Sequence, residues 1–326
     1  MKISIVIPVY NLENCIKSSL DSVFAQTYKN IEVIAVDDGS TDLTPAVLDA
    51  YALKETRLKV IHKLNEGVSK ARLTGIKAAS GEFIGFVDGD DKIDPDMYER
   101  LVKNALGYGA DISHCGYRRL NPDGTVSYYY NTGDVIVQNN EQGLYDLLEG
   151  ARIEPSLCNK VFRASLFLNV TDNPEMDFSL KNNEDLLMNY FLFKSSEKSV
   201  FEDFCPYQYI VRSNSASKGA VSVNKLSDPI KAAKIIYDNS KNNPALLSIS
   251  ARLYAVKLIA AATHKKTADP GVRKAVESAR KELKSFYPEY KSINGIGKTD
   301  IQKARFAALS PRLYSLVHKL YSIINR

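Results

Sequence analysis

The stretch FIGFVDGDD, residues 83–91, joins an apolar run to three carboxylates grouped around one glycine. A run this short and this apolar is typical of a strand buried on both faces of a sheet. Asp88, Asp90 and Asp91 would then lie at the carboxyl end of that strand, where open α/β sheets bind their ligands. Carboxylates this close repel one another unless a cation neutralises them, and Mg²⁺ and Mn²⁺ prefer oxygen ligands. The stretch therefore predicts a metal site. The alternative is an acidic turn, followed by a helix that begins at the Asp-Pro-Asp sequence of residues 94–96.

The residues before this stretch alternate between short apolar runs and segments with helical spacing. The expected strands are 3–9, 31–36, 58–61 and 83–87, and the expected helices are 12–26, 45–51 and 68–80. Strands that alternate with helices of this length predict a Rossmann-like α/β fold with a mostly parallel central sheet. Right-handed crossovers bring the carboxyl ends of such strands, and the loops that follow them, to one edge.

Beyond residue 109 the pattern changes. The pattern predicts a strand at 112–119, a hairpin turn at 121–124 and a second strand at 125–130. It then predicts helices at 140–148 and 186–193 and a strand at 207–212. From residue 228 almost to the end, the spacing of apolar residues is helical. We therefore expect three regions: 1–110 and 111–222, which form the α/β part, and a helical C-terminal region at 223–326.

Composition limits the class of protein. The net charge of +5 is mild, but it is unevenly spread: the first hundred residues are rich in acids and the stretch 225–326 is basic. This asymmetry indicates that the C-terminal part contacts an anionic surface or ligand, and a membrane fits better than a nucleic acid. The four cysteines are far apart and form no CxxC pair, which favours a reducing cytoplasm over a zinc site or a disulfide framework. We expect no signal peptide, because the apolar run at the start reaches proline at position 8. We also expect no transmembrane helix, because no apolar run approaches the roughly 20 residues that span a bilayer.

The C-terminal tail has a second pattern. Between 313 and 324 it places six aliphatic residues on one helical face, with basic residues on or near the other. A basic amphipathic helix within 306–326 would suit peripheral contact with the inner face of the membrane. The same pattern also suits packing on the chain's own domain or on a second copy.

Two acidic loops are expected at the same edge of the sheet: DDGS at 37–40 and DGDD at 88–91. Tyr10 ends the first strand there, and Arg72 follows the turn at 65–67. An aromatic ring beside a carboxylate suits a nucleobase and its ribose. No phosphate-binding glycine loop occurs, so a metal held by the second loop would have to bind the diphosphate. The constellation predicts a site for a nucleoside diphosphate with a divalent ion.

These motifs, taken in series, resemble the family 2 glycosyltransferases, inverting enzymes with the A-type nucleotide-diphospho-sugar transferase fold. The resemblance rests on IVIPVYN at 5–11, SVFAQTY at 22–28, VDDGSTD at 36–42, NEG at 65–67 with Ala71 and Arg72, and VDGDD at 87–91. It covers about the first hundred residues closely, with glycine where the metal-binding DxD motif more often has serine or alanine. Further on, CNKVFR at 158–163 and NEDLL at 183–187 resemble pieces of polysaccharide-assembling members.

The resemblance implies a role for each matching residue. Tyr10 and Asp38 would hold the uracil and ribose of a UDP-sugar, together with the backbone of Pro8 or Val9. Arg72, Asp88 and Gly89 would assist in binding this donor. Asp90 would be the main ligand of Mn²⁺ or Mg²⁺, with Asp88 and Asp91 beside it. Region 1–110 would bind the nucleotide sugar, and region 111–222 would bind the acceptor and carry the catalytic base.

The catalytic base implied by the family is Asp185, with Glu184 as the second candidate. In an inverting transfer the acceptor hydroxyl loses its proton while it attacks the anomeric carbon, and an aspartate within hydrogen-bond reach can take that proton. The alternative is a structural role: Asn183 would cap a helix, and Glu184 and Asp185 would lie in its first turn, where the helix dipole stabilises negative charge.

The expected function is therefore transfer of a hexose or N-acetylhexosamine from a UDP-sugar to a glycan, lipid-linked or protein-linked hydroxyl. A nucleotidyltransferase and a non-catalytic UDP-sugar-binding module are the alternatives. The run Tyr128-Tyr129-Tyr130 fits either a sugar-stacking platform or an ordinary hairpin strand.

Overall fold

The computed structural model describes residues 1–150, 153–212, 220–265, 267–311 and 314. The chain divides into two compact units. The first consists of Met1–Gly143, Glu154–Ser179 and Met188–Gly219, and the second of Leu144–Ile153, Leu180–Leu187 and Ala220–Arg326. The expected limits at residues 110 and 222 stay predictions.

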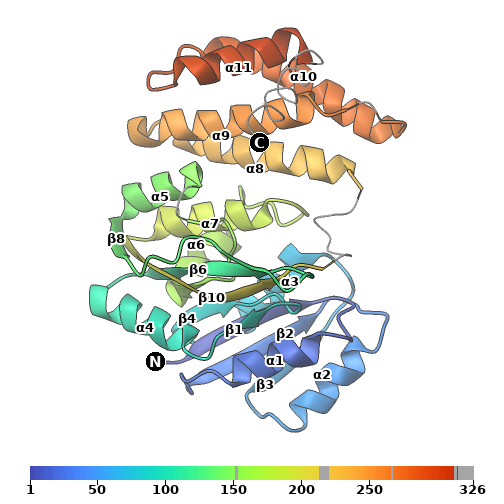
Figure 1. Ribbon diagram of the computed structural model, residues 1–326, viewed down its shortest axis with the longest axis vertical. Coiled ribbons are helices and arrows are strands. Elements are labelled where there is room, and N and C mark those ends of the chain that lie inside the picture. Colours follow the sequence, from blue (N-terminus) through green and yellow to red (C-terminus); the bar gives the residue numbers. More distant parts are fainter. Residues whose placement is uncertain (151–152, 213–219, 266, 312–313, 315–326) are drawn as a thin grey trace. The chain divides into compact units, whose positions relative to one another are not determined.

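The first unit is built on one mixed sheet (Figure 1). Its strands within the described residues are β1 (Ile3–Val9), β2 (Ile31–Asp37), β3 (Leu58–His62), β4 (Phe83–Phe86), β5 (Lys92–Ile93), β6 (Ile112–Leu120), β7 (Val126–Tyr128), β8 (Val135–Asn139), β9 (Lys160–Arg163) and β10 (Lys198–Ile210). The strand order is β3-β2-β1-β4-β9-β6-β10-β5, with β7 paired to β6 and β8 paired to β10.

The first four strands confirm the prediction. β3, β2, β1 and β4 are neighbours and run parallel, and every residue of β1 and β4 is buried. A strand with both faces covered needs apolar side chains on both faces, which is why these segments are continuous apolar runs.

The second half of the sheet differs from the prediction. β9 lies antiparallel between β4 and β6, and β10 begins at Lys198, well before the expected start at 207. β5, β8 and β9 were not expected as strands. These segments are two to five residues long, and their pairing partners lie far away in the sequence, so local patterns do not reveal them.

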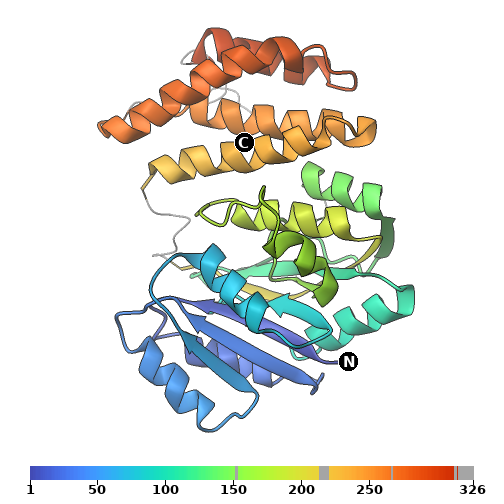
Figure 2. The same cartoon turned by 180° about the vertical axis from the view of Figure 1, so that it is seen from behind.

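Helices α1 (Ile16–Phe24) and α2 (Thr44–Ala52) cover one face of the parallel strands, and α3 (Val68–Ala78) covers the other (Figures 1 and 2). A Cβ at Gly75 of α3 would lie 2.3 Å from Cγ1 of Val6 in β1, so only glycine lets this helix approach the sheet so closely. Helix α4 (Met97–Tyr108), the short helix η1 (Ala164–Phe167) and α6 (Leu168–Thr171) complete the first unit, while α5 (Asn140–Glu149) and α7 (Glu184–Ser195) have residues in both units.

The second unit is helical, as predicted. Its long helices are α8 (Val223–Ser240), α9 (Pro244–Ala262), α10 (Pro270–Tyr290) and α11 (Lys298–Leu309). Asn243 and Asp269 cap α9 and α10 through their side chains, each followed by proline at the first helical position. Tyr237, Tyr254 and Phe286 form ring contacts at the centre of its core.

One helix differs from the expectation about the membrane. By length and composition alone α9 could cross a bilayer, although half of its most apolar window is buried inside the structure. A core helix of a helical domain has the same composition, and α9 supplies Ala251, Tyr254 and Leu258 to the core of the second unit. The predicted amphipathic helix at 313–324 lies outside the described residues, apart from Tyr314.

Candidate active site

The carboxyl ends of β1, β2 and β4 meet at one edge of the sheet, because the three strands are parallel neighbours. Val9 pairs with Asp37, and the Val9 carbonyl accepts a hydrogen bond of 2.8 Å from the backbone N–H of Asp38. Pro8 is buried beside them, whereas the next side chain, Tyr10, is 49% exposed. The Tyr10 ring is thus available at this edge for stacking.

The carboxylate of Asp38 is already bound by the loop that follows β3. Oδ1 accepts hydrogen bonds from Lys63 Nζ (2.8 Å) and the Glu66 N–H (3.0 Å), and Oδ2 accepts one from the Gly67 N–H (2.7 Å). A carboxylate offers about four acceptor positions, and three of them are used here, while the Asp38 side chain is 5% exposed. Asp38 therefore fixes the loop at 63–67.

Arg72 and Asp88 form an ion pair at this edge. Arg72 Nη2 lies 3.1 Å from Asp88 Oδ1; the arginine side chain is 6% exposed and the carboxylate 38% exposed. The arginine comes from the first half of α3, which follows the loop held by Asp38. The structure thus brings together Asp38, Arg72 and Asp88, as the sequence predicted for one edge.

Asp90 lies against Arg212. Arg212 Nη1 is 3.5 Å from Asp90 Oδ2, and Arg212 Nη2 donates a hydrogen bond to the Asp90 carbonyl. Arg212 Nη1 also donates to Cys15 Sγ at 3.0 Å. Burial raises the pKa of Asp90, the Asp88 carboxylate raises it further, and Arg212 opposes them. The carboxylate is 37% exposed, so a ligand can still reach it.

Asp91 has a different environment from the other two carboxylates. It is 2% exposed, and it accepts hydrogen bonds from the Ile210 N–H (2.9 Å) and the Tyr207 hydroxyl (2.8 Å). Burial, followed by repulsion from Asp88, raises its pKa to about 8. Asp91 anchors the acidic loop to β10, and this geometry favours Asp90 and Asp88 over Asp91 as ligands of a cation.

Gly89 has a packing reason for being glycine. A Cβ there would lie 2.8 Å from Cδ1 of Leu12 and 3.2 Å from Cδ1 of Ile16. The acidic loop therefore packs directly against the start of α1.

The residues fit a divalent cation only in part. Within the described ranges, no group of three or more His, Cys, Asp and Glu side chains could hold a metal ion. Asp88 and Asp90 nevertheless supply two partly exposed carboxylates that repel each other, and a divalent cation would relieve this repulsion. A diphosphate could provide further oxygen ligands.

Glu184 and Asp185 are the first two residues of α7 and belong to the second unit, whereas the residues described above belong to the first. Asp185 Oδ1 accepts a hydrogen bond of 2.8 Å from the Leu186 N–H, and a first-turn carboxylate is stabilised by the helix dipole. Burial lowers the pKa of Lys257, and the charge of Asp185 opposes that shift. Glu184 is buried, and Asp185 is the more accessible of the two.

Asp228 positions the segment before α7, and sequence reasoning missed it. This buried carboxylate accepts hydrogen bonds from the Lys181 N–H (3.0 Å) and from Asn182 Nδ2 (3.4 Å). Lys63 and Tyr207 were missed as well. Their side chains act on residues 25 and 116 positions away, and no local signal could have indicated those pairings.

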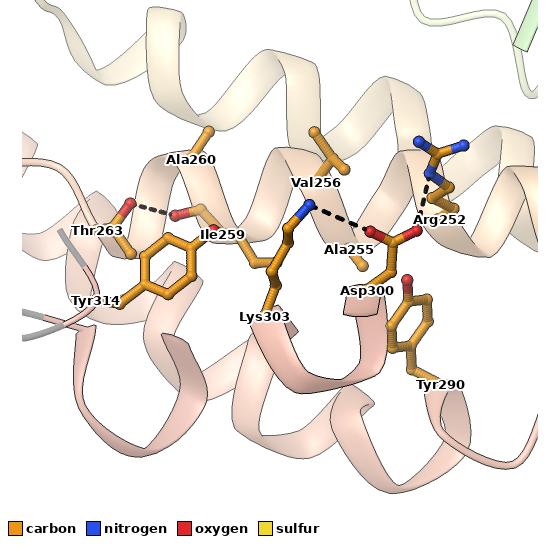
Figure 3. A pocket seen from close by; sticks show the side chains of 10 residues that line it. All are labelled: Arg252, Ala255, Val256, Ile259, Ala260, Thr263, Tyr290, Asp300, Lys303 and Tyr314. Atoms are coloured by element: carbon orange, nitrogen blue, oxygen red, sulfur yellow. Dashed lines mark hydrogen bonds and ion pairs between the residues drawn. The ribbon is translucent and has the colours of Figure 1, made fainter. Parts of the chain in front are cut away.

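A separate cleft of about 380 Å³ lies in the second unit and is lined by residues of α9 and α11 together with Tyr290 of α10 and Tyr314 (Figure 3). Its charged groups pair with one another: Asp300 lies 3.2 Å from Arg252 Nε and 3.6 Å from Lys303 Nζ. We assign this cleft no catalytic role.

The fold is an A-type glycosyltransferase-like α/β fold: a mostly parallel sheet flanked by helices, followed by a helical C-terminal region. The structure of Staphylococcus aureus TarS 1–349 in complex with UDP-GlcNAc superposes with a TM-score of 0.74 at 21% sequence identity, covering 98% of this chain and 92% of that one. At this identity the likeness concerns the fold.

The chain belongs to glycosyl transferase family 2, whose family model matches residues 4–168. It is 34% identical to the glycosyltransferase GlyA of Streptococcus pneumoniae over 225 residues, 67% of this chain and 32% of GlyA. It is 31% identical to the glycosyltransferase GlyG of the same organism over 223 residues, 65% of this chain and 72% of GlyG. The chain spans about a third of the length of GlyA and of EpsJ from Bacillus subtilis, which it also matches.

Proposed function

We propose that this protein transfers a hexose or N-acetylhexosamine from a UDP-sugar to a hydroxyl of a glycan, lipid-linked or protein-linked acceptor, with inversion at the anomeric carbon. The observation that carries the proposal is the edge where the exposed ring of Tyr10, the Asp38 loop and the Arg72–Asp88 pair meet. Family membership supports it over a nucleotidyltransferase, and the UDP-GlcNAc bound to the similar TarS structure supports a uridine nucleotide.

In this proposal the protein holds the donor through several groups. Tyr10 stacks on the uracil, the Pro8–Val9 backbone lies beside it, and the acceptor position left on Asp38 receives a hydrogen bond from the base or ribose. Arg72 keeps Asp88 directed toward the ribose. Asp90 and Asp88 would hold Mn²⁺ or Mg²⁺, which would stabilise the negative charge of the departing diphosphate.

Asp185 is the proposed general base. Its carboxylate would accept the proton of the attacking hydroxyl, since inversion by direct displacement needs no covalent intermediate. Glu184 is the second candidate, although it is the more buried of the two. Asp228 would position both by holding the preceding loop. We further propose action at the cytoplasmic face of the membrane in assembly of a surface glycan, with residues 306–326 as a peripheral contact or as a contact between two copies.

The test is UDP release from a panel of UDP-sugars, with Mn²⁺ or Mg²⁺ and again with a chelator. We expect metal-dependent hydrolysis of one donor and its loss in Asp90→Asn. Asp96→Asn is the matched control, because this surface carboxylate six positions away pairs only with Arg100 among the ion pairs of the described chain. Binding of UDP without turnover of any donor, with or without acceptors, would support the non-catalytic binding module; absence of UDP binding would refute both.

A further inference from the structure

A row of tyrosine rings crosses three neighbouring strands of the first unit. Tyr207 of β10 pairs in register with Tyr117 of β6, and the N–H of Tyr129, just after β7, donates to the Tyr117 carbonyl at 3.0 Å. Residues opposite each other on paired strands share one face of the sheet. The rings of Tyr117 and Tyr129 stack with centroids 5.2 Å apart, and Tyr130 meets Tyr129 edge-on at 4.8 Å. We call Tyr207, Tyr117, Tyr129 and Tyr130 the tyrosine row.

The inner end of the tyrosine row touches the acidic loop. The Tyr207 hydroxyl accepts a hydrogen bond from the Asp88 N–H at 3.3 Å and donates one to Asp91. The outer end reaches solvent, because Tyr130 is 55% exposed. The tyrosine row thus has one member that contacts the acidic loop and one that is exposed at the surface of the same unit.

Polar groups accompany the rings. The hydroxyl of Tyr117 donates to Glu154 Oε1 at 3.4 Å, and the charge of Glu154 also acts on Tyr129. Burial, followed by the charge of Glu154, raises the pKa of both tyrosines to about 12. Arg119 lies over the ring of Tyr209, its partner in the ladder, on the same face.

The outer ring is held in an unusual backbone conformation. Tyr130 and Asn131 have φ angles of 67° and 96°, in the left-handed region that residues with side chains rarely adopt. The buried carboxylate of Asp203 accepts hydrogen bonds from the N–H groups of Asn131 (2.9 Å) and Thr132 (2.8 Å) and so maintains this turn. A conformation that is costly and is supported by a dedicated buried carboxylate is typical of a functional position.

We propose that Tyr129 and Tyr130, together with Glu154, bind a pyranose ring of the acceptor. The C–H face of a sugar ring packs on an aromatic ring, while its hydroxyls need acceptors such as a carboxylate and donors such as a tyrosine hydroxyl. This inference rests on the proposed function, because it assigns the acceptor of that same transferase. Its alternative is an ordinary hairpin whose exposed tyrosines bind nothing.

The chain provides its own control for that alternative. Tyr128 is 56% exposed, almost the same as Tyr130, but it pairs with Arg118. The Arg118 guanidinium binds Asp94, so Arg118 and Tyr128 lie on the opposite face from Tyr117 and Tyr129. Exposure is thus matched between Tyr128 and Tyr130, which differ in their position relative to the tyrosine row and in backbone conformation.

The experiment uses the absence of tryptophan from the sequence. Tyr130→Trp and Tyr128→Trp each introduce a single tryptophan, excited selectively over the tyrosines and titrated with the methyl glycosides of glucose, galactose, rhamnose and N-acetylglucosamine. We expect a saturable blue shift with at least one glycoside in Tyr130→Trp and none in Tyr128→Trp. Adding Glu154→Gln to Tyr130→Trp should weaken that binding about tenfold, because a hydrogen bond to a charged acceptor is lost.

Equal responses of the two tryptophan variants, or no response of Tyr130→Trp to any of the glycosides, would overturn the inference. Binding that is unchanged by Glu154→Gln would remove Glu154 from the site. Hydrolysis of the donor by water does not involve the outer tyrosines, so it reports separately on the proposed function. A variant that hydrolyses the donor but ignores all four glycosides refutes the acceptor site alone.

Discussion

The hydroxyl of Tyr207 donates a hydrogen bond of 2.8 Å to Asp91 Oδ2, across 116 positions of sequence. The Tyr207 hydroxyl oxygen also accepts a hydrogen bond of 3.3 Å from the backbone N–H of Asp88. One side chain of β10 therefore holds both ends of the acidic segment 88–91, and the loop's shape depends on a strand that enters the sheet much later in the chain.

Tyr207→Phe should destabilise the protein by about 1–3 kcal/mol, because it leaves a buried carboxyl group and a backbone N–H without this partner. Urea unfolding measures the free-energy difference. Tyr128→Phe, an exposed substitution, is the control and should stay within about 0.5 kcal/mol of the wild type. An unchanged midpoint for Tyr207→Phe would mean that Tyr207 does not support the loop. A weaker affinity for UDP with Mn²⁺ should accompany the lost stability.

Gly75→Ala should destabilise the protein although alanine is the better helix former. The new Cβ would lie 2.3 Å from Val6 Cγ1 and 3.2 Å from Val6 Cβ, and overpacking of this kind costs about 1–3 kcal/mol. Gly89→Ala should cost less, because its nearest neighbour is the flexible end of Leu12. Adding Val6→Ala to Gly75→Ala should recover part of the loss in a double-mutant cycle, whereas strictly additive effects would contradict the proposed clash.

His62 should contribute stability that depends on pH. Its Nδ1 lies 2.8 Å from Asp37 and its Nε2 lies 3.1 Å from Asp49, and these hydrogen bonds raise the pKa of the imidazole above 6.5. Because the folded pKa is raised, the stabilisation is complete below 6.5 and is lost as pH rises through the folded value. The effect should stay below about 1 kcal/mol, since the side chain is 42% exposed and the pairs are screened.

The measurement for His62 is the difference in unfolding free energy between wild type and His62→Gln at about pH 5.5 and about pH 8.5. The unfolding free energy of the wild type should exceed that of the variant by more at the lower pH than at the higher pH. Lys59→Gln, an exposed change in the same strand, should show no such trend. A difference that is constant or grows with pH would contradict the assignment.

Asp228→Asn should lower the rate of transfer with little effect on donor binding. Asp228 holds Lys181 and Asn182, just before the proposed base, and lies outside the unit that carries the proposed donor site. We expect kcat to fall about tenfold or more, because small misplacements of a catalytic group are costly, while the KM for the UDP-sugar stays near the wild-type value. A raised KM with unchanged kcat would exclude this positioning role. Asp238→Asn, an exposed substitution in the same helix, is the control.

The amino-acid sequence by itself determined the parallel half of the sheet and the loops at its edge. The four apolar runs, the intervening helices and the acids at 37–38 and 88–91 are local patterns, and strand periodicity with helical crossovers leaves few ways to arrange them. The expectation that Tyr10, Asp38, Arg72 and Asp88 share an edge follows from that order, and the structure confirms the arrangement.

Only the tertiary structure decided what each acid does. Asp88, Asp90 and Asp91 are nearly equivalent in sequence, yet an arginine from α3 binds the first, Arg212 binds the second, and Tyr207 with the Ile210 backbone buries the third. The antiparallel insertion of β9 and the alignment of Tyr117, Tyr129 and Tyr207 likewise depend on pairings between distant segments. Such pairings arise when the chain closes long loops, and no local residue pattern encodes them.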